Sequence, residues 1–106
     1  LAGTPEYMPP EQWSAGDTDD IDGRADLYAL GITLFQLIQG VLPYQDRNPF
    51  LLGKRHESEP LPEFTEDLDL PQLLKQLILK ATAKDPGDRY QTADAMRKAL
   101  EALSKT

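Results

Sequence analysis

Side chains able to do chemistry are scarce in this chain of 106 residues. The absence of cysteine excludes disulfides, thiol nucleophiles and cysteine-based zinc sites. The single histidine, His56, has no second ligand candidate at helical spacing, so we expect it to be a surface residue. We therefore predict neither a metal ligand nor a general base at this position.

Four aspartates form the densest group of oxygen ligands in the sequence: Asp17, Asp19, Asp20 and Asp22. A calcium-binding loop is one interpretation. The spacing, however, lacks the EF-hand pattern and its closing glutamate. We favour a solvated acidic loop, so no metal site is predicted here.

The net negative charge of the chain indicates which kinds of binding partner it disfavours. The chain has 11 basic and 18 acidic side chains, with a formal net charge of −7. Such a chain repels phosphate backbones and anionic lipid, so we expect no nucleic-acid binding and no membrane contact. The most apolar run, Ala29 to Ile38, is far shorter than the ~20 residues needed to span a bilayer. The segment LAGTPEYMPPE does not resemble a signal peptide, and we expect a cytoplasmic protein.

The longest predicted element is a helix over residues 24–39. Asp22 can cap its start, and Gly40 and Pro43 stop it. Its apolar positions cover nearly the whole circumference, which indicates a helix buried on most sides and therefore the centre of the fold. These positions are Leu27, Tyr28, Leu30, Ile32, Leu34, Phe35, Leu37 and Ile38.

The remaining elements are also predicted to be helical. A short turn is expected over 10–13 and a short helix over 48–55. Apolar residues recur at helical spacing over 70–81, which predicts an amphipathic helix that ends before the turn at 85–88. The last helix begins at Thr92. No strand pattern and no internal repeat is visible, so the fold class is all-α.

Three short motifs occur in the loops and at the start of the long helix. They are GTPEYMPPE at 3–11, DLYALG at 26–31 and DPGDR at 85–89. In this order and at this spacing they resemble the C-terminal part of a bacterial-type, Hanks-like Ser/Thr protein kinase catalytic domain. The resemblance covers nearly the whole chain. It implies that residues 1–106 are a partial kinase domain, a helical part of the C-lobe without the N-lobe and the catalytic loop.

The resemblance implies a substrate-binding role for the first motif. Gly3, Thr4, Pro5, Glu6 and Tyr7 correspond to the wall that receives the substrate residue after the phosphorylated one. Thr4 corresponds to the threonine that touches the catalytic aspartate and lysine, and it favours Ser/Thr over Tyr specificity. A simple turn remains the alternative interpretation.

The resemblance also implies an ion pair between Glu11 and Arg89, which lie 89 − 11 = 78 positions apart. In the family the corresponding carboxylate and guanidinium are largely buried and hold the activation segment on the helical lobe. A planar guanidinium suits a bidentate contact with a carboxylate. Two unrelated surface charges are the alternative.

Asp26 and Gly31, in the second motif, are expected to be structural. In kinases the aspartate matching Asp26 accepts hydrogen bonds from the backbone of the catalytic loop, which would precede Leu1. An ordinary first-turn aspartate, stabilised by the helix dipole, is the alternative for Asp26.

Phosphoryl transfer by a kinase requires residues that this sequence lacks. Neither a G-x-G-x-x-G loop nor an H-R-D motif occurs. ATP and Mg²⁺ are therefore implied for the full-length parent alone, and we predict that this chain has no catalytic residue, no cofactor and no activity by itself.

Two functions follow for the chain. The first is a fragment of a Ser/Thr kinase that supplies the substrate-side loop and a helical scaffold, with protein substrates in the parent. The second is a stand-alone helical protein-interaction module. A start at Leu1 rather than at methionine favours the first. Because earlier helices would be missing, we also expect self-association through exposed apolar helix surface.

Overall fold

The computed structural model describes residues 5–14, 22–65 and 69–104, and the structural statements below concern these residues. They form helices and contain no strand, which confirms the all-α prediction. In chain order the elements are η1 (Pro5–Tyr7), α1 (Pro10–Ser14), α2 (Gly23–Gln39), α3 (Pro49–Ser58), α4 (Gln72–Ala81), η3 (Pro86–Asp88) and α5 (Ala93–Leu103).

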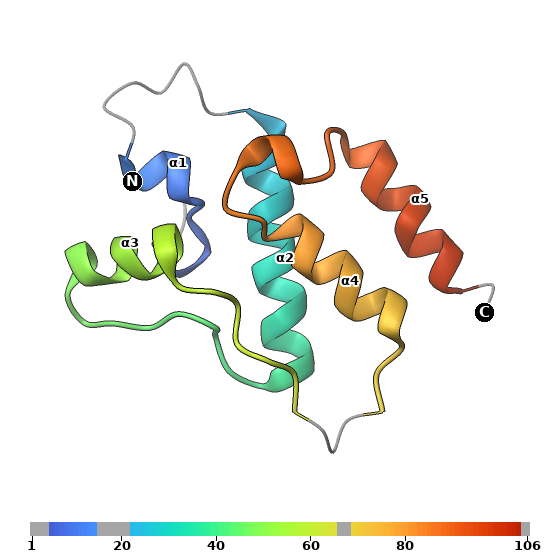
Figure 1. Ribbon diagram of the computed structural model, residues 1–106, viewed down its shortest axis with the longest axis horizontal. Coiled ribbons are helices and arrows are strands. Elements are labelled where there is room, and N and C mark those ends of the chain that lie inside the picture. The colour runs from blue at the N-terminus through green and yellow to red at the C-terminus, as the bar shows by residue number, and fades with distance from the viewer. Residues whose placement is uncertain (1–4, 15–21, 66–68, 105–106) are drawn as a thin grey trace.

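Helix α2 runs through the middle of the molecule, with α4 and α5 on one side and α1 and α3 on the other (Figure 1). The contacts agree with this view: α2 packs against α4, α5 and η1, while α3 packs against α1 and η1. The long helix is therefore the centre of the fold, as its apolar composition predicts.

The ends of α2 follow from local chemistry. The side chain of Asp22 accepts a hydrogen bond from the backbone N–H of Arg24 at 2.9 Å and caps the first turn. At the other end Gly40 has a φ of 78°, a left-handed conformation that glycine adopts without steric cost. Its N–H donates to the carbonyl of Gln36 at 2.8 Å, so the helix ends where the sequence predicts.

Helices α3 and α5 also begin at capping side chains. Asn48 accepts from the N–H of Phe50 at 2.9 Å, and Thr92 accepts from the N–H of Ala95 at 3.0 Å. Helix α3 continues to Ser58, three residues beyond the predicted end at 55.

Helix α4 begins at Gln72, two residues later than predicted. A proline disfavours the helical conformation of the residue before it, and Pro71 therefore excludes Leu70 from the helix. Within the described ranges, none of the helices is long and apolar enough to cross a lipid bilayer.

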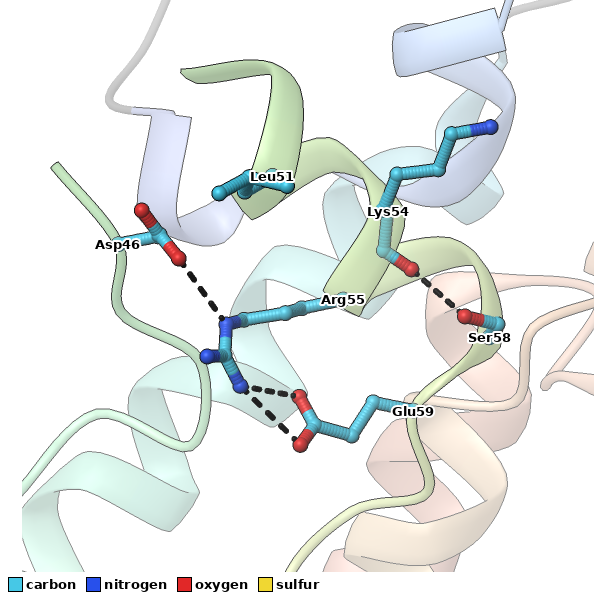
Figure 2. A pocket seen from close by; sticks show the side chains of 6 residues that line it. All are labelled: Asp46, Leu51, Lys54, Arg55, Ser58 and Glu59. Carbon is cyan, nitrogen blue, oxygen red and sulfur yellow. Dashed lines mark hydrogen bonds and ion pairs between the residues drawn. The ribbon is translucent and has the colours of Figure 1, made fainter. Parts of the chain in front are cut away.

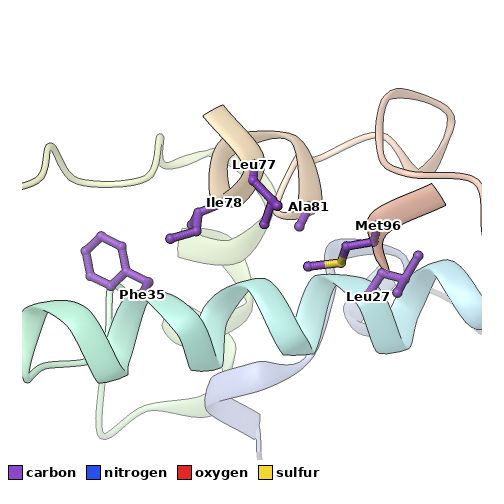
Figure 3. Close-up of a cluster of buried hydrophobic side chains, with 6 residues drawn as sticks. All are labelled: Leu27, Phe35, Leu77, Ile78, Ala81 and Met96. Carbon is purple, nitrogen blue, oxygen red and sulfur yellow. The ribbon is translucent and has the colours of Figure 1, made fainter. Parts of the chain in front are cut away.

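The apolar core lies in two clusters on opposite sides of α2. The first joins α2 to α4 and α5 (Figure 3) and consists of Leu27, Phe35, Leu77, Ile78, Ala81 and Met96. The second lies toward α3 and consists of Tyr28, Ile32, Tyr44 and Leu52.

Helix α2 is buried or half-buried on most sides, as predicted, but one face remains uncovered by the described residues. Leu30 is 41% exposed and Leu37 is 75% exposed. The pattern of apolar residues indicates which positions avoid water, but it cannot show whether their neighbours belong to the same stretch of chain.

Gly31 lies where α2 packs closely against the end of α4. A Cβ atom placed there would lie 2.7 Å from Cγ2 of Thr82 and 2.9 Å from Cβ of Ala81. Both distances are shorter than real carbon contacts allow, so the two helices would have to separate. The absence of a side chain at position 31 therefore sets the distance between the helices.

We expect Gly31→Ala to lower the free energy of unfolding by about 1–3 kcal/mol, the usual cost of overpacking a core. Gly23→Ala is the matched control, because a Cβ at this other helical glycine meets nothing within 4 Å. Urea unfolding of both variants measures the difference. A Gly31→Ala variant as stable as Gly23→Ala would contradict the close approach.

Candidate functional site

The first described segment, Pro5–Tyr7, is held against the central helix. The hydroxyl of Tyr7 donates a hydrogen bond to Oε1 of Gln36 on α2. The N–H of Met8 donates to the carbonyl of Pro5 at 3.2 Å and closes the turn of η1. Gly3 and Thr4, the first two residues of the predicted substrate wall, lie outside the described residues. Pro5, Glu6 and Tyr7 thus have a defined position on the protein surface.

Helix α1 connects this segment to α3. The indole Nε1–H of Trp13 donates to the carbonyl of Met8 at 3.0 Å. The indole ring lies on Gly53 of α3, where a Cβ atom would come within 2.8 Å of Cε3. Both α1 and η1 therefore pack against α3.

Glu11 and Arg89 form the ion pair that the motifs imply. Nη1 of Arg89 lies 2.7 Å from Oε2 of Glu11, and Nη2 lies 2.8 Å from Oε1. The Arg89 side chain is 0% exposed and that of Glu11 is 15% exposed. The contact is therefore bidentate and largely buried, the geometry in which a charge-assisted pair is strongest.

Three backbone carbonyls accept the remaining hydrogen bonds of the Arg89 guanidinium. Nε donates to Ala83 at 2.7 Å, Nη1 to Arg24 at 3.2 Å and Nη2 to Lys84 at 3.2 Å. With the two bonds to Glu11, every N–H of the guanidinium has an acceptor. Arg89 thus joins α1, the start of α2 and the loop after α4.

A buried aromatic cluster lies beside this pair. The guanidinium carbon of Arg89 lies 4.8 Å from the ring centroid of Tyr28, a cation–π distance. The hydroxyl of Tyr28 shares a hydrogen bond of 2.7 Å with Nδ1 of His56. The imidazole stacks on Trp13 and meets the ring of Tyr44 edge to face, at centroid distances of 6.1 Å and 4.8 Å.

The prediction that His56 is a surface residue is wrong, since its side chain is 0% exposed. Its Nε2 atom has no hydrogen-bond partner among the described residues. Burial, helped by the charge of Lys84, lowers the pKa of His56 to about 4, while the backbone of Glu6 opposes the shift. The histidine is therefore neutral at physiological pH, and its ring packs against those of Trp13, Tyr28 and Tyr44.

The comparisons with known proteins agree with the motifs. No family model matches the chain. Its relatives include serine/threonine-protein kinase pkn3 of Myxococcus xanthus, 37% identical over 108 residues, and Pkn1 of the same organism, 43% identical over 102 residues. Serine/threonine-protein kinase PknB of Mycobacterium tuberculosis is 38% identical over 98 residues.

The alignments cover 99%, 95% and 92% of this chain but 19%, 14% and 15% of the three relatives. The chain therefore spans less than a fifth of the length of the curated relatives that it matches. It corresponds to a segment of bacterial Ser/Thr protein kinases. The alignment with pkn3 covers 99% of the chain and therefore includes the motifs at 3–11, 26–31 and 85–89.

In this kinase segment Asp26 is exposed. It makes neither a hydrogen bond nor an ion pair with the described residues. Asp26 precedes Leu30 by four positions and Leu37 by 37 − 26 = 11 positions, so the three side chains lie on the same side of α2. The uncovered face therefore contains a carboxylate as well as two leucines. The described structure thus places Asp26 in the first turn of α2 with its side chain exposed.

A shallow pocket beside α3 is lined by four charged side chains, those of Asp46, Lys54, Arg55 and Glu59 (Figure 2). At its centre Nε of Arg55 lies 3.5 Å from Oδ2 of Asp46, and Nη1 lies 3.0 Å from Oε2 of Glu59. The two carboxylates therefore neutralise the guanidinium at the centre of the pocket.

Asp17, Asp19 and Asp20 of the acidic loop lie outside the described residues. In the part of the chain that the structure describes, no three His, Asp or Glu side chains are grouped closely enough to hold a metal ion.

Proposed function

We propose that residues 1–106 are part of the C-lobe of a Ser/Thr kinase catalytic domain and act in phosphorylation of protein serines and threonines within a longer protein. The N-lobe and the catalytic loop would belong to the remainder of that protein. The buried pair between Glu11 and Arg89 carries this proposal. It joins two residues 78 positions apart and so anchors the segment that contains Pro5–Tyr7 to the helices.

Within the longer kinase, Gly3, Thr4, Pro5, Glu6 and Tyr7 would form the wall that receives the substrate residue after the phosphorylated one. The contact of Tyr7 with Gln36 supports this assignment, since it fixes the segment on the rigid central helix. Glu11, Arg89, Asp26 and Gly31 would be structural. Asp26 would accept hydrogen bonds from the catalytic loop across the uncovered face of α2.

The chemistry of ATP and Mg²⁺ would come from the rest of the kinase. The phosphate-binding glycine loop, the strand lysine with its glutamate partner and the magnesium-binding aspartate are standard parts of kinase catalysis, and their motifs do not occur in this sequence. The longer protein would act in the cytoplasm, where ATP is available.

The chain alone is expected to bind no Mg-ATP. Isothermal titration calorimetry with Mg-ATP measures this, and the full-length kinase that contains the segment serves as the positive control. Saturable binding of Mg-ATP by the 106-residue chain in the micromolar range would contradict the proposed function. A reading frame that encodes these residues alone would instead favour the stand-alone interaction module.

Self-association is a second property that we propose for the isolated chain. Leu30 and Leu37 expose an apolar surface on α2, and two copies could cover it for one another. Light scattering after size-exclusion chromatography should show a mass that rises above 11.9 kDa with concentration. Leu37→Glu should keep the chain monomeric, whereas an unvarying monomer of the unsubstituted chain would disprove the pairing.

A further inference from the structure

Lys84 lies in the loop after α4 and is half-buried. Its Nζ atom donates a hydrogen bond to the hydroxyl of Tyr44 at 2.9 Å. The same nitrogen lies 4.4 Å from the centroid of the Tyr44 ring. The lysine therefore reaches the aromatic cluster behind α3 rather than extending into solvent.

Lys84 has no carboxylate within ion-pair distance among the described residues. Two other lysines do: Nζ of Lys54 lies 3.8 Å from Glu57, and Nζ of Lys98 lies 3.4 Å from Asp94. Those lysine side chains are 59% and 70% exposed. Lys84 thus combines reduced solvation with the lack of a neutralising partner, whereas the two exposed lysines have both water and a carboxylate.

The charged groups around Lys84 act in opposite directions. Burial is the main cause that disfavours the ammonium form of Lys84, and the positive charge of Arg89 adds to it. The carboxylate of Glu59 favours the ammonium form. The net result is that the pKa of Lys84 is lowered to about 8. Glu59 is itself paired with Arg55. The face of the Tyr44 ring also attracts the ammonium. The ring of His56 also contacts the Tyr44 ring, and this histidine is neutral.

Loss of the proton from Lys84 would break no hydrogen bond. The Tyr44 hydroxyl donates to the backbone carbonyl of Glu59 at 2.7 Å and accepts from Nζ. A neutral amine still has two N–H groups and can donate to the same hydroxyl. The site therefore accommodates the nucleophilic form of the lysine with its contacts intact.

We propose that Lys84 is a site of Nε-acylation by acyl phosphates. The lone pair of the neutral amine attacks the carbonyl carbon of the acyl phosphate, and an N–C bond forms. The C–O bond to phosphate breaks, phosphate leaves with the bonding electrons, and the proton of the attacking nitrogen passes to water. The product is a neutral amide that retains one N–H.

Acylation at Lys84 would act on α3. The amide has no positive charge, so its attraction to the Tyr44 ring is lost, and the acyl group needs additional volume beside the ring. Tyr44 joins the loop before α3 to Glu59 at the end of α3 through its hydroxyl. A modified Lys84 would therefore loosen the packing of α3, which contacts α1 and η1. This inference does not depend on the proposed kinase function.

The test is treatment of the folded chain with acetyl phosphate at pH 7.5, followed by peptide mass spectrometry. We expect the initial rate of acetylation at Lys84 to exceed the rates at Lys54 and Lys98 at least about fivefold, because a larger fraction of Lys84 is neutral. Exposure alone predicts the opposite order, since both reference lysines are more accessible. Equal or slower labelling of Lys84 would overturn the proposal.

The same labelling in concentrated urea is the control for the role of the fold. Unfolding removes the cluster, so the rates at the three lysines should become equal within about twofold. A preference for Lys84 that persists in urea would assign it to local sequence and overturn the structural explanation. In the folded chain, the Lys84 rate should reach half its maximum near pH 8, whereas a midpoint above pH 10 would show an ordinary lysine.

Discussion

Replacing Arg89 by alanine is expected to lower the free energy of unfolding by about 3–5 kcal/mol. The substitution leaves the carboxylate of Glu11 without its two guanidinium contacts in a largely buried position, and it leaves three backbone carbonyls without their donor. A domain of this size is typically stable by roughly 5–15 kcal/mol, so the substitution should remove a large share of the total stability. Urea or thermal unfolding followed by circular dichroism measures the effect.

Arg97→Ala is the matched control for the loss of a guanidinium. Arg97 also contacts two carboxylates, Asp94 and Glu101, but its side chain is 54% exposed. Exposed pairs contribute little, so we expect a loss below about 1 kcal/mol. Arg89→Lys should lie between the two, because an ammonium keeps the charge without the bidentate geometry. Equal effects of Arg89→Ala and Arg97→Ala would show that burial of the pair does not matter.

The chain is also expected to lose about 3 kcal/mol of stability between pH 6.5 and pH 4 through His56 alone. The unfolded chain binds a proton at His56 near pH 6.5, whereas the folded chain does so near pH 4. The lowered pKa therefore favours the folded state above pH 6.5, and this contribution disappears as the pH falls through the interval. The physical cause is the burial of the imidazole beside Lys84.

Urea unfolding at a series of pH values measures this dependence. Between pH 6 and pH 5 the free energy of unfolding should change by up to about 1.4 kcal/mol per pH unit, the slope for one proton. His56→Gln removes the titrating group, so its profile should be flatter in this interval whatever its stability at pH 8. A wild-type profile that is level from pH 6.5 to pH 5 would contradict the buried neutral histidine.

Local chemistry in the sequence determined where the helices lie. Asp22, Asn48 and Thr92 accept hydrogen bonds from the backbone at the starts of α2, α3 and α5, and Gly40 ends α2 in a left-handed conformation. These interactions involve residues that are close in sequence, so they can be predicted without the fold. The two-residue error at the start of α4 arises because Pro71 disfavours the helical conformation of Leu70, and α3 runs three residues past its predicted end to Ser58, close to Pro60.

The contact between Glu11 and Arg89 was also predictable, although it joins positions 78 residues apart. The reason is that both residues stand in motifs shared with kinases, and the motifs imply the pair. No periodicity or capping rule would have found it. The structure adds the carbonyl acceptors on Ala83, Arg24 and Lys84, which explain why a guanidinium and not an ammonium occupies the position.

Only the tertiary structure decided the surroundings of His56, Lys84 and the leucines of α2. His56 is buried because Tyr28 and Tyr44 pack around it. These two residues precede it by 28 and 12 positions in the sequence. Lys84 meets Tyr44 across 40 positions. Leu30 and Leu37 have the same apolar character as their buried neighbours and yet are exposed. Side-chain type reports a preference for water or for the core, but burial depends on which distant segments arrive, and that is a property of the folded chain.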